Sequence, residues 1–229
     1  MKIGIIGAMS VEVDALKAQI KDLRTTTVSG IEFFEGVLFG KDAVVARCGI
    51  GKVFAAICAQ SMILRFGVTH VINTGVGGTL TDRLNILDVA VADGVVQHDM
   101  DTSPIGDPVG LISGINKVVL PTSKVLCDAA LKAADKLCIN AVSGIIASGD
   151  QFISSKERKQ FIASTFAAIC CEMEGAAIGH VCYVNGVECL IVRAISDSAT
   201  GDAEMEYPEM VARAAAQSQK MIEEIIYNL

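Results

Sequence analysis

Residues 166–178 read FAAICCEMEGAAI, and this stretch decides the fold of the chain. Phe166 to Cys170 form an uninterrupted apolar run, which is typical of a buried strand. Glu172 and Glu174 follow it, and the run from Gly175 to Ile178 then indicates the start of a helix. The stretch therefore predicts a buried strand that delivers two carboxylates to the edge of a sheet.

A second predicted strand ends in the same way. Glu188 to Ile195 is rich in β-branched and apolar residues, and Ser196-Asp197-Ser198 follows it directly. Charges at the end of a buried strand are costly unless they are paired or used. In open α/β sheets, ligands bind at the carboxyl ends of the strands. Two acid-ended strands therefore predict a functional site at one edge of the sheet.

The rest of the chain alternates between strand and helix patterns, which predicts a single α/β domain over residues 1–229 with a mixed central sheet flanked by helices. Two β-rich runs on either side of Gly40 predict an antiparallel hairpin. The predicted strands are 3–8, 25–29, 31–39, 43–48, 71–73, 89–96 and 141–147; the predicted helices are 13–23, 52–66, 126–137, 156–163 and, with Pro208 in its first turn, a last helix to about Tyr227. We expect a glycine-rich turn at 74–78 and a long loop at 98–118.

Composition excludes several classes of protein. The chain has 229 residues, is 52% hydrophobic and carries a net charge of −7, which argues against nucleic-acid or anionic-membrane partners. No uncharged stretch reaches the about 18 apolar residues of a membrane helix. Its eight cysteines form no Cys-x-x-Cys pair and lack zinc-binding spacing, so we expect free thiols, no metal and a cytoplasmic location.

Glycine-rich turns after two strands raise the possibility of a nucleotide cofactor. The segment 4–7 does not match G-x-G-x-x-G, and 49–53 lacks the Ser or Thr that follows Lys in a P-loop. Neither a dinucleotide nor a triphosphate site is predicted. Tight turns and close approach of a ligand both remain open as reasons for these glycines.

Each acidic candidate also has an ordinary structural explanation. Glu12 lies in the first turn of a predicted helix, where an acid favours the helix dipole. Glu172 and Glu174 could be a solvated helix start, and Asp197 could cap a turn. Arg193, near the end of a buried strand, needs a carboxylate partner, for which Glu172 or Glu174 is nearest in sequence. His98 and His180 are expected to be structural.

Taken together, six motifs resemble one family. They are Met9-Ser10-Val11-Glu12-Val13, Cys48-Gly49-Ile50-Gly51-Lys52, Asn73-Thr74-Gly75, the run from Ser148 to Ile153, Glu172-Met173-Glu174, and the run from Val192 to Asp197. In this order they look like the 5′-methylthioadenosine/S-adenosylhomocysteine nucleosidases of the nucleoside phosphorylase superfamily. The resemblance extends from residue 1 to the C-terminus.

This resemblance implies a homodimer without metal or organic cofactor that hydrolyses the adenine N-glycosidic bond of small thionucleosides, a reaction of methionine salvage. It implies that Asp197 is the general acid at adenine N7, that Glu12 activates water, and that Glu174 holds the ribose hydroxyls. Its other implied binding residues are Met9, Ile50, Gly78, Phe152, Ile153, Met173, Ser196 and Tyr207, with Arg193 and Glu172 as structural support. The chemistry fits, since a poor leaving group needs an acid on one side and an activated water on the other.

Three positions depart from the family pattern. Val76 stands where many relatives carry Ser, Thr79 replaces a common Gly, and Arg47 lies where phosphate-using relatives place basic groups. A purine nucleoside phosphorylase and a non-catalytic nucleoside-binding protein therefore remain alternatives. The sequence does not choose among methylthioadenosine, S-adenosylhomocysteine and 5′-deoxyadenosine.

Overall fold

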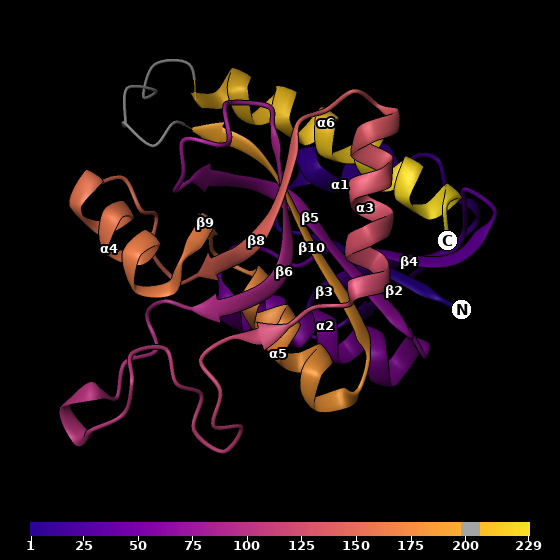
Figure 1. Ribbon diagram of the computed structural model, residues 1–229. Helices are drawn as coiled ribbons and strands as arrows, with labels where there is room; N and C mark the ends of the chain where they lie inside the picture. Colours follow the sequence, from indigo (N-terminus) through magenta and orange to yellow (C-terminus); the bar gives the residue numbers. More distant parts are fainter. Residues whose placement is uncertain (198–206) are drawn as a thin grey trace.

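The computed structural model describes residues 1–197 and 207–229, the side chains of residues 207 and 208 excepted. Within these residues all the strands join one mixed sheet, flanked by helices (Figure 1). The strands are β1 (Ile3–Gly7), β2 (Lys21–Val28), β3 (Ile31–Leu38), β4 (Lys41–Arg47), β5 (His70–Thr79), β6 (Val89–Gln97), β7 (Leu120–Pro121), β8 (Ala141–Ser148), β9 (Ala168–Glu172) and β10 (Glu188–Asp197). The helices are α1 (Ser10–Lys17), α2 (Lys52–Phe66), α3 (Lys124–Lys136), α4 (Lys156–Phe166), α5 (Gly175–Asn185) and α6 (Tyr207–Tyr227), with a short 3₁₀ turn at Ser103–Ile105.

The sheet closes on itself at one end. β10 lies between β5 and β6, parallel to β5 and antiparallel to β6. β6 pairs with β8, β8 with β9, and β9 returns to β5 through Gly78 and Thr79. From β5 the sheet continues outward through β1, β4, β3 and β2. β5 is therefore the strand at which the closed part and the open part of the sheet meet.

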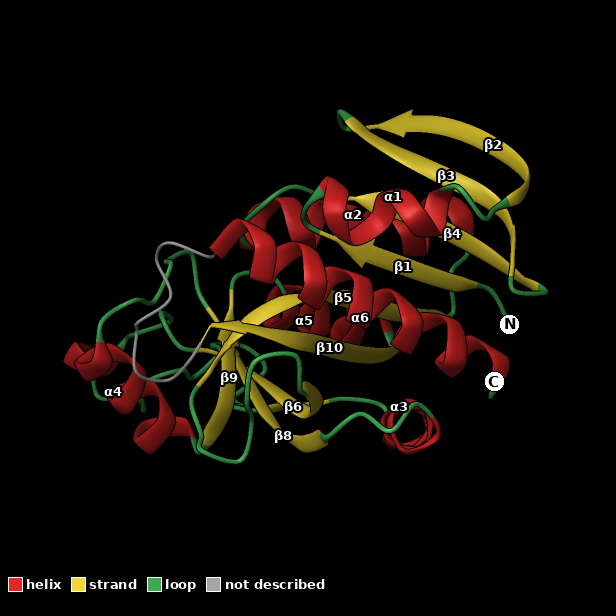
Figure 2. Cartoon of the chain, turned by 90° about the horizontal axis from the view of Figure 1, so that it is seen from above, coloured by secondary structure: helices red, strands yellow, loops and turns green. Residues whose placement is uncertain are grey.

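Helices cover both faces of the sheet (Figure 2). α1, α3 and α6 pack on one face, over a core that includes Ile5, Ile72 and Ile222. α2 and α5 pack against each other on the other face, over Met62 and Ile178. Each fully buried aliphatic side chain contributes about 1.5–3 kcal/mol of transfer free energy, so these two cores hold the site-bearing strands in place.

The predicted α/β fold with a mixed sheet is confirmed, and so is the β3–β4 hairpin, whose turn residue Gly40 has φ +81°. The helix predicted for 13–23 was wrong at its end. α1 stops at Lys17, Ile20 packs into the core, and Leu23 lies in β2 with 44% of its surface exposed. The β-branched Thr25, Thr26 and Thr27 favour an extended strand here, and this preference outweighs the helical spacing upstream.

The glycine-rich turn predicted for 74–78 was also wrong. These residues continue β5, with Gly75 opposite Arg193 and Gly77 opposite Ile195 on β10. A Cβ on Gly75 would lie 2.7 Å from Glu12 Oε1, and a Cβ on Gly78 would lie 2.9 Å from Asp197 Oδ2. The glycines therefore make room for acidic side chains beside a strand instead of turning the chain.

Among the residues that the structure describes, no helix is both long and apolar enough to cross a membrane.

Candidate active site

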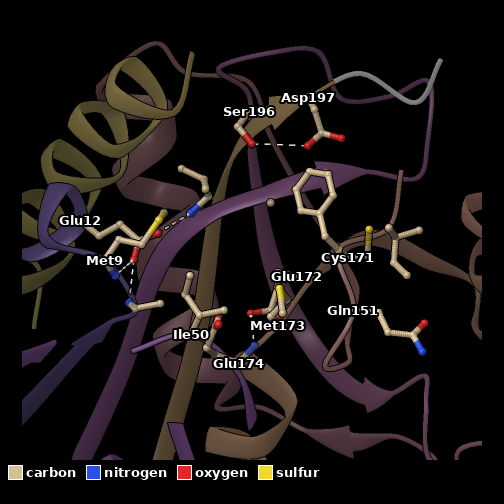
Figure 3. Close-up of a pocket in the computed structure, with 16 residues that line it drawn as sticks. Met9, Glu12, Ile50, Gln151, Cys171, Glu172, Met173, Glu174, Ser196 and Asp197 are labelled. Atoms are coloured by element: carbon tan, nitrogen blue, oxygen red, sulfur yellow. Dashed lines mark hydrogen bonds between the residues drawn. The ribbon is translucent and has the colours of Figure 1, made fainter. Parts of the chain in front are cut away.

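A cavity of about 140 Å³ opens where β1, β9 and β10 end and where the second half of β5 runs past them. Segments far apart in the sequence meet here (Figure 3). The described residues that line it are Ala8, Met9, Glu12, Ile50, Val76, Gly77, Gly78, Gln151, Phe152, Ile153, Cys171, Glu172, Met173, Glu174, Ser196 and Asp197. The edge predicted from the two acid-ended strands is the edge that holds this cavity.

Glu12 is held by main-chain groups. Its Oε2 accepts hydrogen bonds from the Ala8 and Met9 amides at 2.7 and 2.9 Å, and its Oε1 accepts one from the Val76 amide at 3.2 Å. The bond from Met9 also caps the start of α1, so Glu12 stabilises the helix start as well as bordering the cavity. Burial raises the pKa of Glu12, while Arg193 and the three amides oppose that rise.

Arg193 lies buried beneath the cavity and joins its acids. It forms an ion pair with Glu172, and its Nη2 lies 3.9 Å from Glu174 Oε2. Its Nη2 also donates to the side chain of Asn73. Glu172 in turn accepts from the Glu174 amide at 3.0 Å and from the Gly175 amide at 2.8 Å, at the start of α5. Arg193 therefore has the carboxylate partner that the sequence indicated, and Glu172 is fully engaged in holding this structure.

Glu174 has a freer carboxylate than Glu172. Its Oε1 accepts from the Gly51 amide at 2.9 Å, and the side chain borders the cavity. Burial, and next the charge of Glu172, raise the pKa of Glu174 to about 7, against the opposing effect of Arg193. One carboxyl group in this cavity thus changes its charge near neutral pH.

Asp197 lies at the other side of the cavity from Glu12 (Figure 3). Its Oδ2 accepts a hydrogen bond from Lys159 Nζ at 2.8 Å, and Ser196 Oγ lies 3.4 Å from its Oδ1. The Asp197 side chain keeps 17% of its surface exposed, whereas that of Lys159 keeps 5%. The two acids that the sequence singled out therefore border one cavity from different elements.

The structure brings most of the predicted binding residues to this cavity. Phe152 borders it with 63% of its surface exposed, and Ile153 beside it packs partly against α4. Tyr207 begins α6, but its side chain lies outside the described residues. The other predicted binding residues that line the cavity are Met9, Ile50, Gly78, Met173, Glu174 and Ser196.

Sequence reasoning missed Lys159, Gln151 and Cys171. Lys159 is buried on the face of α4 that also carries Ile162 and Phe166. The spacing of three and four residues was visible in the sequence, and a lysine within an apolar helical stripe was the available signal. Gln151 lies inside the motif from Ser148 to Ile153 and Cys171 directly precedes Glu172, but no pattern gave either of them a role.

The three departures have different structural settings. Val76 lines the cavity and donates its amide to Glu12. Thr79 is buried, and its hydroxyl bonds the main chain of Thr81. Arg47 donates to Ser10 Oγ at 2.6 Å and borders a separate groove, outside the lining of the site cavity. The basic residue that suggested phosphate is therefore not part of this cavity.

His98 and His180 are absent from the described lining of the cavity. Both ring nitrogens of the buried His98 lack a hydrogen-bond partner among the described residues. Within the same residues, no three His, Cys, Asp or Glu side chains are grouped so that they could hold a metal ion.

Comparison with known proteins identifies the family. The sequence pattern of the phosphorylase superfamily matches residues 2–227. The chain belongs to this superfamily. It is 38% identical to the 5′-methylthioadenosine/S-adenosylhomocysteine nucleosidase of Shewanella frigidimarina over the full length of both chains. It is 40% identical to an aminodeoxyfutalosine nucleosidase of Helicobacter pylori, covering 100% of this chain and 99% of that protein.

A solved structure agrees with the sequence comparison. A mutant of the Helicobacter pylori 5′-methylthioadenosine/S-adenosylhomocysteine nucleosidase, crystallised with 5′-methylthioadenosine in its active site, superimposes with a TM-score of 0.95. The identity is 40%, and the match covers 100% of this chain and 99% of that one. The chain is thus a nucleosidase, an enzyme that hydrolyses an N-glycosidic bond, and the predicted resemblance is confirmed.

Proposed function

We propose that this nucleosidase hydrolyses the bond between adenine and the ribose of 5′-methylthioadenosine, S-adenosylhomocysteine and 5′-deoxyadenosine. The products are adenine and the 5-thio- or 5-deoxyribose. One observation carries the proposal: Glu12 and Asp197 border the same cavity from different sides, and Glu174 borders it as well (Figure 3). The bond to be broken can therefore lie between an acid and a base.

Asp197 is the general acid of the proposed reaction. Adenine is a poor leaving group as an anion, so the Asp197 carboxyl gives its proton to N7 while the bond from C1′ to N9 breaks. Adenine then departs neutral, and its bonding electrons stay on the base. Proton transfer of this kind contributes roughly 10²–10⁴-fold to a rate.

Glu12 activates the nucleophile. A water molecule forms the new bond to C1′ and gives a proton to the Glu12 carboxylate, which balances the proton that Asp197 gives up. The raised pKa of Glu12 suits this role, because a base works best when its pKa lies closer to the working pH. Three amide donors keep its oxygens fixed as the proton arrives.

Glu174 and its neighbours hold the sugar and the base. Its carboxylate accepts hydrogen bonds from the ribose hydroxyls and stabilises positive charge on the ring in the transition state. Met173 packs on the sugar, Phe152 stacks on adenine, and the Ile153 backbone reads the adenine edge. Gly78 and Ser196 border the base, whereas Met9, Ile50 and Tyr207 receive the 5′ substituent.

Water is favoured over phosphate as the nucleophile. Four carboxylates, those of Glu12, Glu172, Glu174 and Asp197, line the cavity, and none of its described lining residues is Lys or Arg. A phosphate dianion needs several convergent cations, so this lining disfavours it. We therefore expect phosphorolysis to be negligible.

The test is a product analysis with purified protein. Incubation with 5′-methylthioadenosine should release adenine and free 5-methylthioribose at a rate that does not depend on phosphate concentration. Recovery of the sugar 1-phosphate by chromatography would replace hydrolysis with phosphorolysis. No adenine from any of the three nucleosides would refute the proposed substrates.

Aminodeoxyfutalosine is a second candidate substrate. The 40% identical relative from Helicobacter pylori is named for its action on this nucleoside. A large groove shares Ala8, Met9 and Ile50 with the site cavity, and this groove offers space for a bulky 5′ substituent. Values of kcat/KM for aminodeoxyfutalosine and the three adenine nucleosides, measured side by side, rank the substrates.

We further propose a homodimer that works in the cytoplasm, where it would serve methionine salvage. Ile50, Val53 and Phe54 are large apolar side chains at the start of α2 with more than half of their surface exposed. Exposed apolar side chains that gather in this way are typical of a protein interface. All eight cysteines are free thiols, which suits a reducing compartment. Light scattering that gives the mass of one chain would refute the dimer.

A further inference from the structure

Lys159 is a buried cation in direct contact with the proposed acid. It lies on α4 with only 4% of its surface exposed, and its Nζ is 2.8 Å from Asp197 Oδ2. A buried ammonium group is costly unless it is paired, and breaking such a pair leaves an uncompensated charge. A lysine buried in this way therefore indicates a specific role, and its contact with the Asp197 carboxylate suggests which one.

Other described contacts hold Asp197 only weakly. The pairing of β10 with β5 shifts register between Ile195 and Asp197, and Asp197 then pairs with Gly78, which places the backbone of Asp197 but not its carboxylate. Ser196 Oγ lies 3.4 Å away, at the long end of hydrogen bonding. Gly78, next to the carboxylate, has no side chain with which to confine it.

The helix that carries Lys159 is itself well anchored. Ile162 and Phe166 pack with Ala147 and Ala168 in a small core of their own between α4 and the sheet. Ser155 caps the helix start by accepting from the Arg158 amide at 3.1 Å. The backbone that carries Lys159 is thus held in place by α4, and its ammonium group can define where the Asp197 carboxylate lies.

We propose that Lys159 is a positioning residue for the general acid and holds the Asp197 carboxyl in line with adenine N7. The inference rests on the proposed function, in which Asp197 protonates that nitrogen. Lys159 itself does not touch the reacting atoms. It acts on the reaction through Asp197, so its removal impairs reactions in which the leaving group needs a proton.

The experiment compares two leaving groups in the full-length protein. The first substrate is 5′-methylthioadenosine, and the second is 4-nitrophenyl 5-methylthioriboside, whose nitrophenolate leaves without protonation. With the first, Lys159→Met should lower kcat on the order of 10- to 100-fold, the loss that a displacement of about 1 Å can cause, while KM stays nearly unchanged. With the second, Lys159→Met should match the unmodified protein.

Two further variants complete the design. Lys159→Arg keeps the cation and should recover most of kcat for 5′-methylthioadenosine. Lys156→Met removes an exposed lysine from the same helix and should change neither substrate's turnover. If Lys159→Met does not fold, Lys159→Gln keeps a polar side chain and serves in the same comparison.

Two outcomes overturn the inference. Unchanged kcat for 5′-methylthioadenosine in Lys159→Met means that Asp197 is held by other groups. An equal loss on both substrates means that Lys159 supports the cavity as a whole and does not act through the acid. Failure of the proposed function is visible separately, because the unmodified protein would then release no adenine.

Discussion

The two sides of the cavity hold their acids in different ways. Glu12 accepts three main-chain hydrogen bonds, from Ala8, Met9 and Val76. Asp197 accepts its shortest hydrogen bond from the end of a long side chain, that of Lys159. Glu12 also lies in the first turn of α1, whereas Asp197 ends β10, where the ladder is irregular.

This difference separates two designs for fixing a carboxylate. Main-chain donors are retained in every substitution at the donor residue except proline, so the position of Glu12 is fixed by the fold itself. A side-chain donor can be removed by one substitution, and among the described contacts of the Asp197 carboxylate that of Lys159 is the shortest. We therefore expect the acid side to be the more easily damaged one.

Removing the acids themselves should have the largest effect. Asp197→Asn and Glu12→Gln should each lower kcat for 5′-methylthioadenosine by roughly 10²–10⁴-fold, because each loses a proton-transfer group. Asp197→Asn should still bind a substrate analogue in calorimetry and should cleave 4-nitrophenyl 5-methylthioriboside. Glu12→Gln should lose both reactions. Near-normal adenine release by either variant removes that residue from the mechanism.

The same two variants should differ in stability. Both Glu12 oxygens accept main-chain donors, so the amide nitrogen of Gln would have to face one of them, and an unsatisfied buried donor costs about 1–3 kcal/mol. Asp197→Asn leaves the buried Lys159 ammonium without its carboxylate, which costs about 3–5 kcal/mol, so it should lower the melting temperature more than Glu12→Gln does. Equal melting temperatures would contradict the proposed contrast.

Adding a side chain to β5 beside each carboxylate should lower the rate of adenine release by a smaller factor. An added Cβ at Gly75 would lie 2.7 Å from Glu12 Oε1, and one at Gly78 would lie 2.9 Å from Asp197 Oδ2. Gly75→Ala and Gly78→Ala should each lower adenine release on the order of 10- to 100-fold by displacing their acid. With the nitrophenyl substrate, only Gly75→Ala should be impaired. Equal impairment of both variants would mean that β5 as a whole has moved.

The pH dependence should report Glu174, which borders the cavity as well. Since the pKa of Glu174 is raised to about 7 and that of Glu12 is also raised, kcat/KM should fall as the pH drops below about 7. The raised pKa of Glu174 also makes the stability of the protein depend on pH. The folded state binds this proton more tightly than the unfolded chain, so stability from Glu174 is complete below its ordinary pKa and is lost as the pH rises through about 7.

The variant Glu174→Gln tests whether the protein loses stability as the pH rises through about 7. Its melting temperature relative to the unmodified protein should rise between pH 5 and pH 8, by about 5 °C. A relative melting temperature that does not change with pH would contradict the raised pKa.

Val76→Ser should have the smallest effect. It introduces a hydroxyl on the cavity wall and leaves the hydrogen bond from the residue 76 amide to Glu12 in place. We expect KM for 5′-methylthioadenosine to change by no more than about 3-fold, the worth of one exposed hydrogen bond. A much larger gain in kcat would mean that the acid side of this chain is incomplete without that hydroxyl.

Much of the fold followed from local patterns. Continuous apolar runs identified β1, β6, β8, β9 and β10, and helical periodicity identified α2, α3 and α6. The prediction went wrong where a residue's role is set by distant parts of the chain. Gly75 and Gly78 suggested a turn, because the side chains for which they make room, Glu12 and Asp197, are remote in sequence.

Those features of the site that depend on residues close together in the sequence could be predicted. The acids at strand ends pointed to the edge of the sheet that holds the cavity, and the ion pair between Arg193 and a neighbouring Glu followed from the cost of a buried charge. Lys159 was missed because a charged run such as 156–159 is usually a solvated helix face. The spacing of Lys159 with Ile162 and Phe166 was the available signal, but it was weaker than the charged run, and burial depends on how α4 packs.

The position of β10 also bears on how the enzyme is made. β10 is inserted between β5 and β6 and brings Asp197 with it, whereas Glu12 is among the first residues to leave the ribosome. Until β10 is synthesised, β5 and β6 lack a shared neighbour and expose strand edges, which are prone to incorrect pairing. A nascent chain therefore carries the proposed base long before it carries the proposed acid, and we expect no cleavage of a nucleoside until β10 joins the sheet.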